Sequence, residues 1–170
     1  QIPYAFPFKP GADSKGPVRV DGALYPFGYG LSYTTFVYSD FHISKPVIGI
    51  QGETEVSCKV CNTGQREGDE IVQLYIRDDI SSVTTYQKSL RGFERIHLKA
   101  GEETTVRFTL TPRDLSLWNK HEEFVVEPGT FTIMIGRSSE DICLHGKLTV
   151  NAYHASSEDK PAAKADLLGY

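Results

Sequence analysis

Two pairs of adjacent carboxylates, Asp69-Glu70 and Asp78-Asp79, are the residues of this chain best suited to general acid–base chemistry. That chemistry requires carboxyl groups that face the same substrate. Neighbours on a strand point to opposite faces of the sheet, so neither pair converges if it lies on a strand. In a loop, such residues are usually solvated turn positions. We therefore expect no catalytic residue in this chain.

The cysteines offer a second candidate chemistry, because Cys58 and Cys61 form a C-x-x-C motif. A redox C-x-x-C normally opens a helix, and a zinc site needs a second pair of ligands. Here the flanking residues alternate as in a strand, where positions three apart face opposite sides of the sheet. We expect packing rather than redox or metal chemistry, and three cysteines are too few for a disulfide framework.

Other catalytic and cofactor motifs are missing from the sequence. Gly28-Tyr29-Gly30 lacks the lysine and the strand–loop–helix setting of a phosphate loop, and no G-x-S-x-G motif occurs. The histidines are scattered without metal-ligand spacing, at His42, His97, His121, His145 and His154. We therefore expect no cofactor and no metal, and we expect the chain alone to be inactive.

The richest binding chemistry lies in an aromatic segment, residues 24–33, which holds a proline, two glycines and four aromatic rings. It has too many breakers for a helix and too many rings for a solvated linker. Rings supply large buried areas at low rotamer cost, and an exposed apolar patch of this size usually marks a contact surface. We predict a strap pressed against another surface through Tyr25, Phe27, Tyr29 and Tyr33.

Three further aromatic residues are candidates for stacking on a sugar ring. Trp118 follows two leucines, so we expect it to plug one end of the domain, and Tyr75 lies in a strand that reads as buried on both faces. Tyr86 lies in a long polar loop, residues 78–89, and is the best candidate for contact with a sugar or a neighbouring domain.

Composition narrows the partners further. The chain has 170 residues and a net charge of −4 without a basic run, which argues against nucleic acid as a partner. No apolar stretch approaches the roughly 20 residues of a membrane span, so we expect no membrane association. The chain starts at Gln1 without an apolar leader, which we interpret as a mature or excised fragment.

From Phe36 onward, short alternating runs separated by turn signals predict about eight strands. No sustained helical period occurs, and Pro112 opens a single expected helical turn. The fold class is therefore all-β, and the spacing of the strands is typical of a β-sandwich. We divide the chain into an irregular N-terminal strap over residues 1–35, a β-sandwich over residues 36–150, and a tail over residues 151–170 that we expect to be mobile.

Several motifs, in order and spacing, resemble the fibronectin type III-like domain at the C-terminus of family 3 glycoside hydrolases. The resemblance covers about residues 1–150, and the chain departs from it at Thr85-Tyr86, where that family commonly has Arg-Pro. The similar segments are Ile2-Pro3-Tyr4, Leu24 to Phe36, Asn62-Thr63-Gly64, Gly68 to Ile76, Leu90-Arg91-Gly92-Phe93, Gly101-Glu102, Glu127-Pro128-Gly129 and Gly136 to Ser139.

The resemblance implies a parent enzyme of the β-glucosidase or β-xylosidase type whose catalytic residues lie in other domains. It implies that this chain is non-catalytic and braces those catalytic domains, and that the parent is periplasmic or extracellular. Oligosaccharide is a further expected partner. The alternative is an independent carbohydrate-binding or adhesion module.

Overall fold

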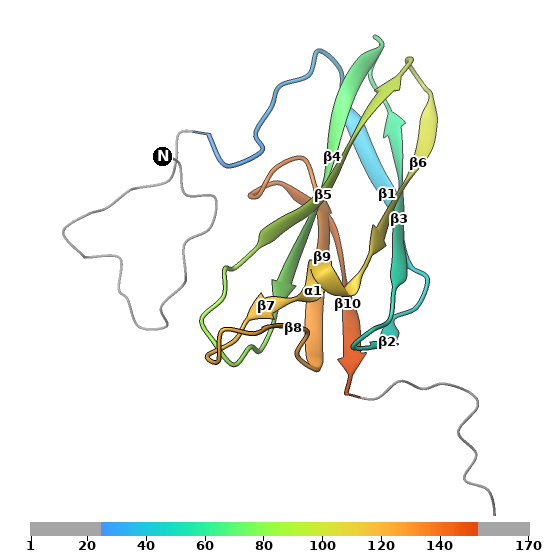
Figure 1. Cartoon of the computed structure of the whole chain (residues 1–170). Helices are drawn as coiled ribbons and strands as arrows, with labels where there is room; N and C mark the ends of the chain where they lie inside the picture. Colours follow the sequence, from blue (N-terminus) through green and yellow to red (C-terminus); the bar gives the residue numbers. More distant parts are fainter. Residues whose placement is uncertain (1–24, 153–170) are drawn as a thin grey trace, which may run out of the picture.

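Alternating apolar residues build two sheets that pack face to face in the computed structural model, which describes residues 25–152 (Figure 1). The first sheet has the strand order β1-β3-β6 and is antiparallel throughout. Its strands are β1 (Phe36–Ile43), β3 (Thr54–Asn62) and β6 (Glu103–Leu110). In β3, Val56, Cys58 and Val60 are fully buried. Cys61 is half-buried, as the alternation of a strand predicts.

The second sheet has the order β2-β10-β9-β4-β5 and is antiparallel except where β2 pairs with β10. Its strands are β2 (Val47–Gly49), β10 (Ile142–Asn151), β9 (Gly129–Gly136), β4 (Gly68–Asp78) and β5 (Ser89–Leu98). The register of β4 against β5 shifts where Gly92 pairs with Leu74, which places a β-bulge at the predicted break. These sheets confirm the predicted all-β fold.

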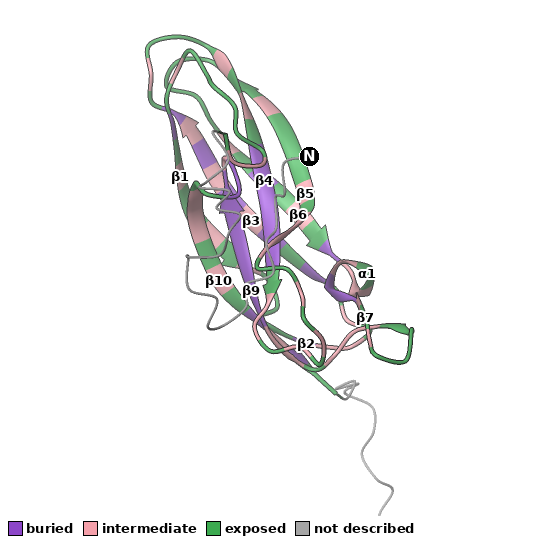
Figure 2. Cartoon of the chain, turned by 90° about the vertical axis from the view of Figure 1, so that its left-hand side faces the viewer, coloured by how far each residue is buried: buried purple, intermediate pink, exposed green. Residues whose placement is uncertain are grey.

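The core lies between the two sheets. Val72, Leu74 and Ile76 of β4 enter it, together with Phe131, Ile133 and Ile135 of β9 and Leu148 and Val150 of β10. The alternate β4 residues Gln73 and Tyr75 point the other way but are also buried, so the central strand is covered on both faces. Figure 2 shows this continuous burial as purple ribbon along β4 and β9.

The segment that connects β6 of the first sheet to β9 of the second sheet carries the remaining elements. The helix α1 (Pro112–Leu115) begins at the predicted proline, and the Asp114 carboxylate accepts hydrogen bonds from the Thr111 amide (2.8 Å) and hydroxyl (2.7 Å). The strands β7 (Leu117–Trp118) and β8 (Phe124–Val125) then form a small hairpin. Strands β2 and β7 were not predicted, because two or three residues are too short to show a period.

The expectation for Trp118 is wrong. Its side chain is 64% exposed and packs against Phe124 with ring centroids 5.4 Å apart, rather than closing the sandwich. The end of the core is instead closed by Leu115, which is 4% exposed. The leucines before Trp118 misled the prediction, since they are carried by a helical turn and a hairpin strand that turn the indole outward.

Parts of the predicted domain division fall outside the described residues. These are residues 1–24 of the strap and residues 153–170 of the tail. Within residues 25–152, no helix is long and apolar enough to cross a membrane.

Candidate functional site

The strap enters the described structure as a tight turn held against the second sheet. The Tyr29 amide donates to the Pro26 carbonyl (3.0 Å), and Gly28 has a φ of +79°. A positive φ at the third position is the requirement of a type II turn, and glycine meets it without strain. A Cβ at Gly28 would also collide with the Gln73 side chain. The sequence therefore turns here because only glycine fits the site.

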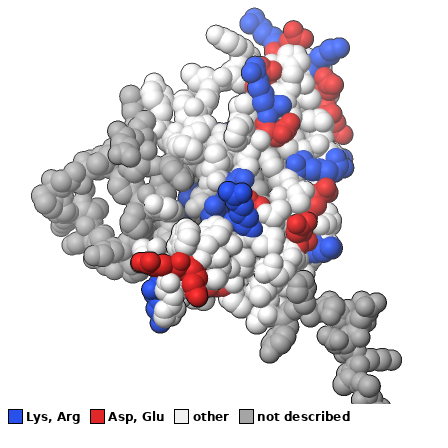
Figure 3. Space-filling model, in the orientation of Figure 1, with Lys and Arg blue, Asp and Glu red and all other residues white. Residues whose placement is uncertain are grey.

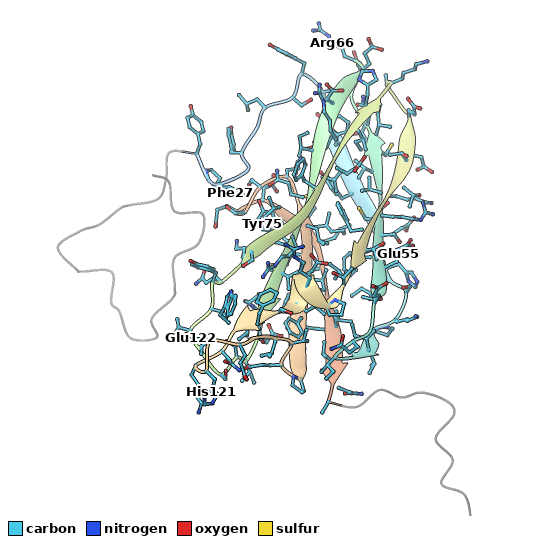
Figure 4. All side chains as sticks on the ribbon, in the orientation of Figure 1. Phe27, Glu55, Arg66, Tyr75, His121 and Glu122 are labelled. Atoms are coloured by element: carbon cyan, nitrogen blue, oxygen red, sulfur yellow. The ribbon has the colours of Figure 1, made fainter. Side chains whose placement is uncertain are left out.

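A buried polar pair on β4 anchors this turn. The Gln73 side-chain amide donates to the Gly28 carbonyl (2.9 Å) and to the Arg137 carbonyl (2.6 Å). The Tyr75 hydroxyl in turn donates to the Gln73 side-chain oxygen (2.5 Å). Burial raises the pKa of Tyr75 to about 12, so this hydroxyl stays protonated and remains a donor at neutral pH. Figure 4 shows Phe27 and Tyr75 beside each other on this side of the domain.

Further bonds hold the rest of the strap. The Ser139 amide donates to the Phe27 carbonyl (2.9 Å), so the loop after β9 is hydrogen-bonded to the strap turn. Towards β1, the Thr34 hydroxyl donates to the Asn62 side-chain oxygen (2.7 Å). Asn62 is fully buried and also donates to the Leu98 carbonyl (3.0 Å), so it ties the strap to both sheets. Backbone and buried amides thus fix the strap from Phe27 to Thr34.

The outer side of the strap is apolar and exposed. Tyr33 is 94% exposed, Leu31 86%, Tyr25 55% and Tyr29 46%. Residues 25–35 carry no charged side chain, and their part of the surface is white in Figure 3. We call these four side chains the strap face. A fixed backbone that presents large apolar groups to solvent is typical of a protein–protein contact surface.

A groove of about 650 Å³ runs between the strap and the second sheet. Its floor includes Phe36 and Gln73, and the exposed ring of Phe93 from β5 stands at its side. Its lining residues are Pro26 to Ser32, Thr34, Phe36, Asp69, Glu70, Ile71, Gln73, Leu90, Phe93, Arg137, Ser138, Glu140 and Asp141. The strap side of the groove carries no charged residue, whereas the sandwich side combines apolar residues such as Phe93 with charged ones such as Glu70 and Arg137.

The structure places the five predicted contact residues in two regions. Tyr25, Phe27, Tyr29 and Tyr33 lie together in the strap, whereas Tyr86 is 55% exposed and lies in a separate hollow of about 580 Å³. We call this hollow the polar groove. It is lined by Arg77, Asp78, Asp79, Thr85, Tyr86, Gln87 and Lys147. Of the other two aromatic candidates, Trp118 is exposed on the β7–β8 hairpin, whereas Tyr75 is fully buried, as the sequence predicts.

The structure gives the two members of each carboxylate pair different surroundings. Hydrogen bonds from Arg95 and His97 lower the pKa of Asp69, while burial raises the pKa of its neighbour Glu70. Burial raises the pKa of Asp78 to about 6. Hydrogen bonds from Lys147, Thr132 and Arg77 outweigh the burial of Asp79 and lower its pKa. In each pair the pKa of one carboxyl is lowered and that of the other is raised, and the expectation that neither pair is catalytic stays a prediction.

Metal ligands do not gather in the described part of the chain either. Among residues 25–152, no group of three or more His, Cys, Asp or Glu side chains is arranged to hold an ion. At the tip of the β7–β8 hairpin, His121 and Glu122 lie at the end of the domain away from Arg66 (Figure 4).

Two anchors of the strap were missed by the sequence analysis. Gln73 was read only as part of a buried strand, and Asn62 only as a turn residue. A signal for Gln73 did exist: an amide inside an otherwise apolar buried run must find partners, and here those partners are the strap and Tyr75. No comparable signal links Asn62 to Thr34, because the two residues are 28 positions apart in the sequence.

Comparison with known proteins agrees with this architecture. The family model described as "Fibronectin type III-like domain" matches residues 70–139. The chain is 46% identical over 144 residues to a β-xylosidase of Formosa agariphila, covering 82% of this chain and 20% of that protein. It is 48% identical over 130 residues to thermostable β-glucosidase B of Acetivibrio thermocellus, covering 76% and 17%. A periplasmic β-glucosidase of Salmonella typhimurium is 42% identical over 137 residues, covering 78% and 18%.

Solved structures give the same result. A β-glucosidase from Listeria innocua in complex with isofagomine superposes with a TM-score of 0.76 at 32% identity, covering 89% of this chain and 22% of that one. The family 3 β-glucosidase of Bifidobacterium adolescentis superposes with a TM-score of 0.69 at 34% identity, covering 74% and 18%. The chain thus spans about a fifth of the length of these relatives. It is a fibronectin type III-like domain of the kind found within family 3 β-glucosidases and β-xylosidases.

Proposed function

We propose that this chain is the non-catalytic C-terminal domain of a family 3 glycoside hydrolase, and that it braces the catalytic domains of its parent through the strap face. The parent would hydrolyse β-glycosidic bonds as a β-glucosidase. The single observation that carries the proposal is the strap itself. Its backbone is anchored by Gln73 and Asn62, while Leu31 and Tyr33 are held out to solvent.

Apolar side chains that face water add little to the stability of an isolated domain, so their exposure on a fixed backbone favours a partner surface that covers them. Burying those side chains against a partner domain would return roughly 25 cal/mol for each Å² removed from solvent. The chain matches only about a fifth of its relatives, so such a partner surface would be supplied by the remainder of the parent. A brace of this kind would raise the stability of the catalytic domains without contributing a catalytic group.

The proposal extends to domain limits and compartment. Residues 1–35 would form the link from the catalytic region, residues 36–150 the sandwich and residues 151–170 a tail. The parent would act in the periplasm or outside the cell, an assignment supported by the periplasmic β-glucosidase among the relatives.

A domain exchange tests the bracing role. The segment of thermostable β-glucosidase B that matches this chain is deleted in one variant and replaced by the full 170-residue chain in another. We expect the deletion to lower the melting temperature and the soluble yield, and the replacement to restore both. Unchanged melting temperature and activity after the deletion would contradict a bracing role.

We also infer that oligosaccharide is a second partner of the domain. The observation that favours it is the polar groove, which combines a partly exposed tyrosine with charged hydrogen-bonding groups. An independent carbohydrate-binding module would use the same groove, and it would differ from a brace in needing no contact through the strap face.

A further inference from the structure

The polar groove resembles a small-molecule binding site, rather than an interface between domains, in its size and in its lining residues. It lies at the end of β4, beside the following loop and beside Lys147 of β10. Its volume of about 580 Å³ falls within the roughly 300–1,000 Å³ of small-molecule sites. Unlike the strap groove, most of its lining side chains are charged or hydroxyl-bearing.

Its polar side chains are held in place by one another. Asp79 accepts hydrogen bonds from Lys147 (2.7 Å), Thr132 (2.7 Å) and Arg77 (3.1 Å). Thr132 in turn accepts from Arg77 (3.3 Å) and Lys147 (2.7 Å). Side chains that are already ordered lose little entropy when a ligand binds, so this hydrogen-bond network is preorganised for recognition.

The hydrogen-bond network leaves some N–H donors of Arg77 and Lys147 unused. A guanidinium has five N–H donors, and the bonds within the network use one on Nε and one on Nη2 of Arg77. An ammonium has three, and Lys147 uses two. The remaining N–H groups belong to side chains that line the polar groove, where adjacent hydroxyl groups of a ligand would be suitable acceptors.

Tyr86 supplies an apolar wall beside these donors, since its side chain is 55% exposed and lines the groove. A tyrosine ring is a rigid surface with a polar tip, which suits a ligand that is apolar on one face and hydroxylated at its edge. A pyranose ring has that form. The two cations of the groove are largely balanced by Asp79 and Asp78, so a neutral ligand fits better than an anion.

We propose that the polar groove binds a neutral pyranose unit of an oligosaccharide, with Tyr86 stacking on the ring and with Arg77 and Lys147 donating to its hydroxyls. The choice of ligand class rests on the proposed function, whereas the location and the residue roles rest on the geometry. The site would hold substrate near the parent enzyme without taking part in bond cleavage.

The test is an NMR titration of the full 170-residue chain with cellobiose and with xylobiose, followed by amide shifts. We expect saturable shifts confined to residues 77–87 and the neighbourhood of Lys147, with millimolar affinity. Tyr86→Ala and Lys147→Met should each weaken binding about tenfold, which corresponds to about 1.4 kcal/mol. Tyr86→Phe keeps the ring and should bind nearly as well as the unmodified chain.

Tyr29→Ala is the matched control, because Tyr29 has similar exposure (46%) but lies in the strap. It should leave sugar affinity unchanged. Absence of shifts at sugar concentrations far above millimolar, or an equal loss in Tyr29→Ala, would overturn the proposal. Stronger shifts with inorganic phosphate than with sugar would overturn it as well, by identifying an anion site. The titration needs no catalytic domain, so its failure is separate from failure of the bracing role.

Discussion

Replacing Gln73 with methionine should release the strap, because this amide is the main tie between the strap turn and the second sheet. The substitution keeps the length of the side chain but removes both donated bonds and the accepted one. Each such bond contributes about 1 kcal/mol net, so the expected loss in the free energy of unfolding is about 3 kcal/mol. Gln73 is 4% exposed, so water cannot readily replace the lost partners.

A double-mutant cycle separates the anchor from general damage to the core. Tyr75→Phe removes a single bond and should cost about 1 kcal/mol. Added to Gln73→Met, the same change should cost nothing or restore up to about 1 kcal/mol, because the tyrosine hydroxyl no longer has an acceptor. Denaturant unfolding of the four proteins gives the coupling energy.

Hydrogen exchange shows where the structure loosens. The Ser139 amide, which donates to the Phe27 carbonyl, should exchange faster in Gln73→Met. Amides of β3 should change only as much as global stability does. A loss below about 0.5 kcal/mol, or a coupling energy of zero with Tyr75, would refute the claim that these residues form a strap anchor.

Three further predictions concern other parts of the domain. Burial raises the pKa of Asp78 to about 6, so the native state binds this proton more tightly than the unfolded state does. The stabilisation of the native state by this proton is fully present below about pH 4 and is lost as the pH rises through about 6. Asp78→Asn should therefore gain stability relative to the unmodified chain between pH 4 and pH 7, by about 1 kcal/mol after allowance for partial exposure; a pH-independent difference in melting temperature would contradict this. Gly28→Ala should cost at least about 1 kcal/mol and expose the strap turn to proteolysis, since φ is +79° and the new methyl group meets Gln73; equal proteolysis rates would count against it. Asp114→Ala should cost about 1 kcal/mol in thermal unfolding through loss of the helix cap, whereas Asp114→Asn should retain part of it; equal losses would argue against capping.

The sequence predicts the fold best in strands that are long and that bury only one of their two faces. In β3 and β6 the alternation of apolar and polar residues in the sequence matches the alternation of burial along each strand. The unbroken run in β4 correctly predicts burial on both faces, but the pattern does not say what covers the outer face. The cover is the strap, whose contact with Gln73 joins residues 45 positions apart and has no local signature.

The sequence was least informative for short elements and outward-facing aromatics. Strands β2 and β7 contain three and two residues, which is too few for a period. Trp118 was misplaced because a large apolar residue after two leucines reads as core, whereas the hairpin geometry decides which way the indole faces. Aromatic density with glycine breaks does predict a strap held against another surface, and the structure holds residues 27–34 against the second sheet. Contact of its outer aromatic residues with a partner stays a prediction.

The central claim is that the strap face binds the catalytic domains of a parent enzyme. Leu31 and Tyr33 test it most directly, because they are 86% and 94% exposed and contribute little to the domain alone. The double variant Leu31→Ser, Tyr33→Ser is compared with Val37→Ser, Val47→Ser, whose side chains are 49% and 54% exposed elsewhere. Melting temperatures are measured for the isolated chain and for the exchange protein built on thermostable β-glucosidase B.

The account predicts that the strap variant leaves the isolated chain unchanged within about 0.5 kcal/mol but lowers the melting temperature of the exchange protein by several degrees. The control variant should have no larger effect in the exchange protein than in the isolated chain. Equal melting temperatures for the strap variant and the unmodified exchange protein would contradict the account.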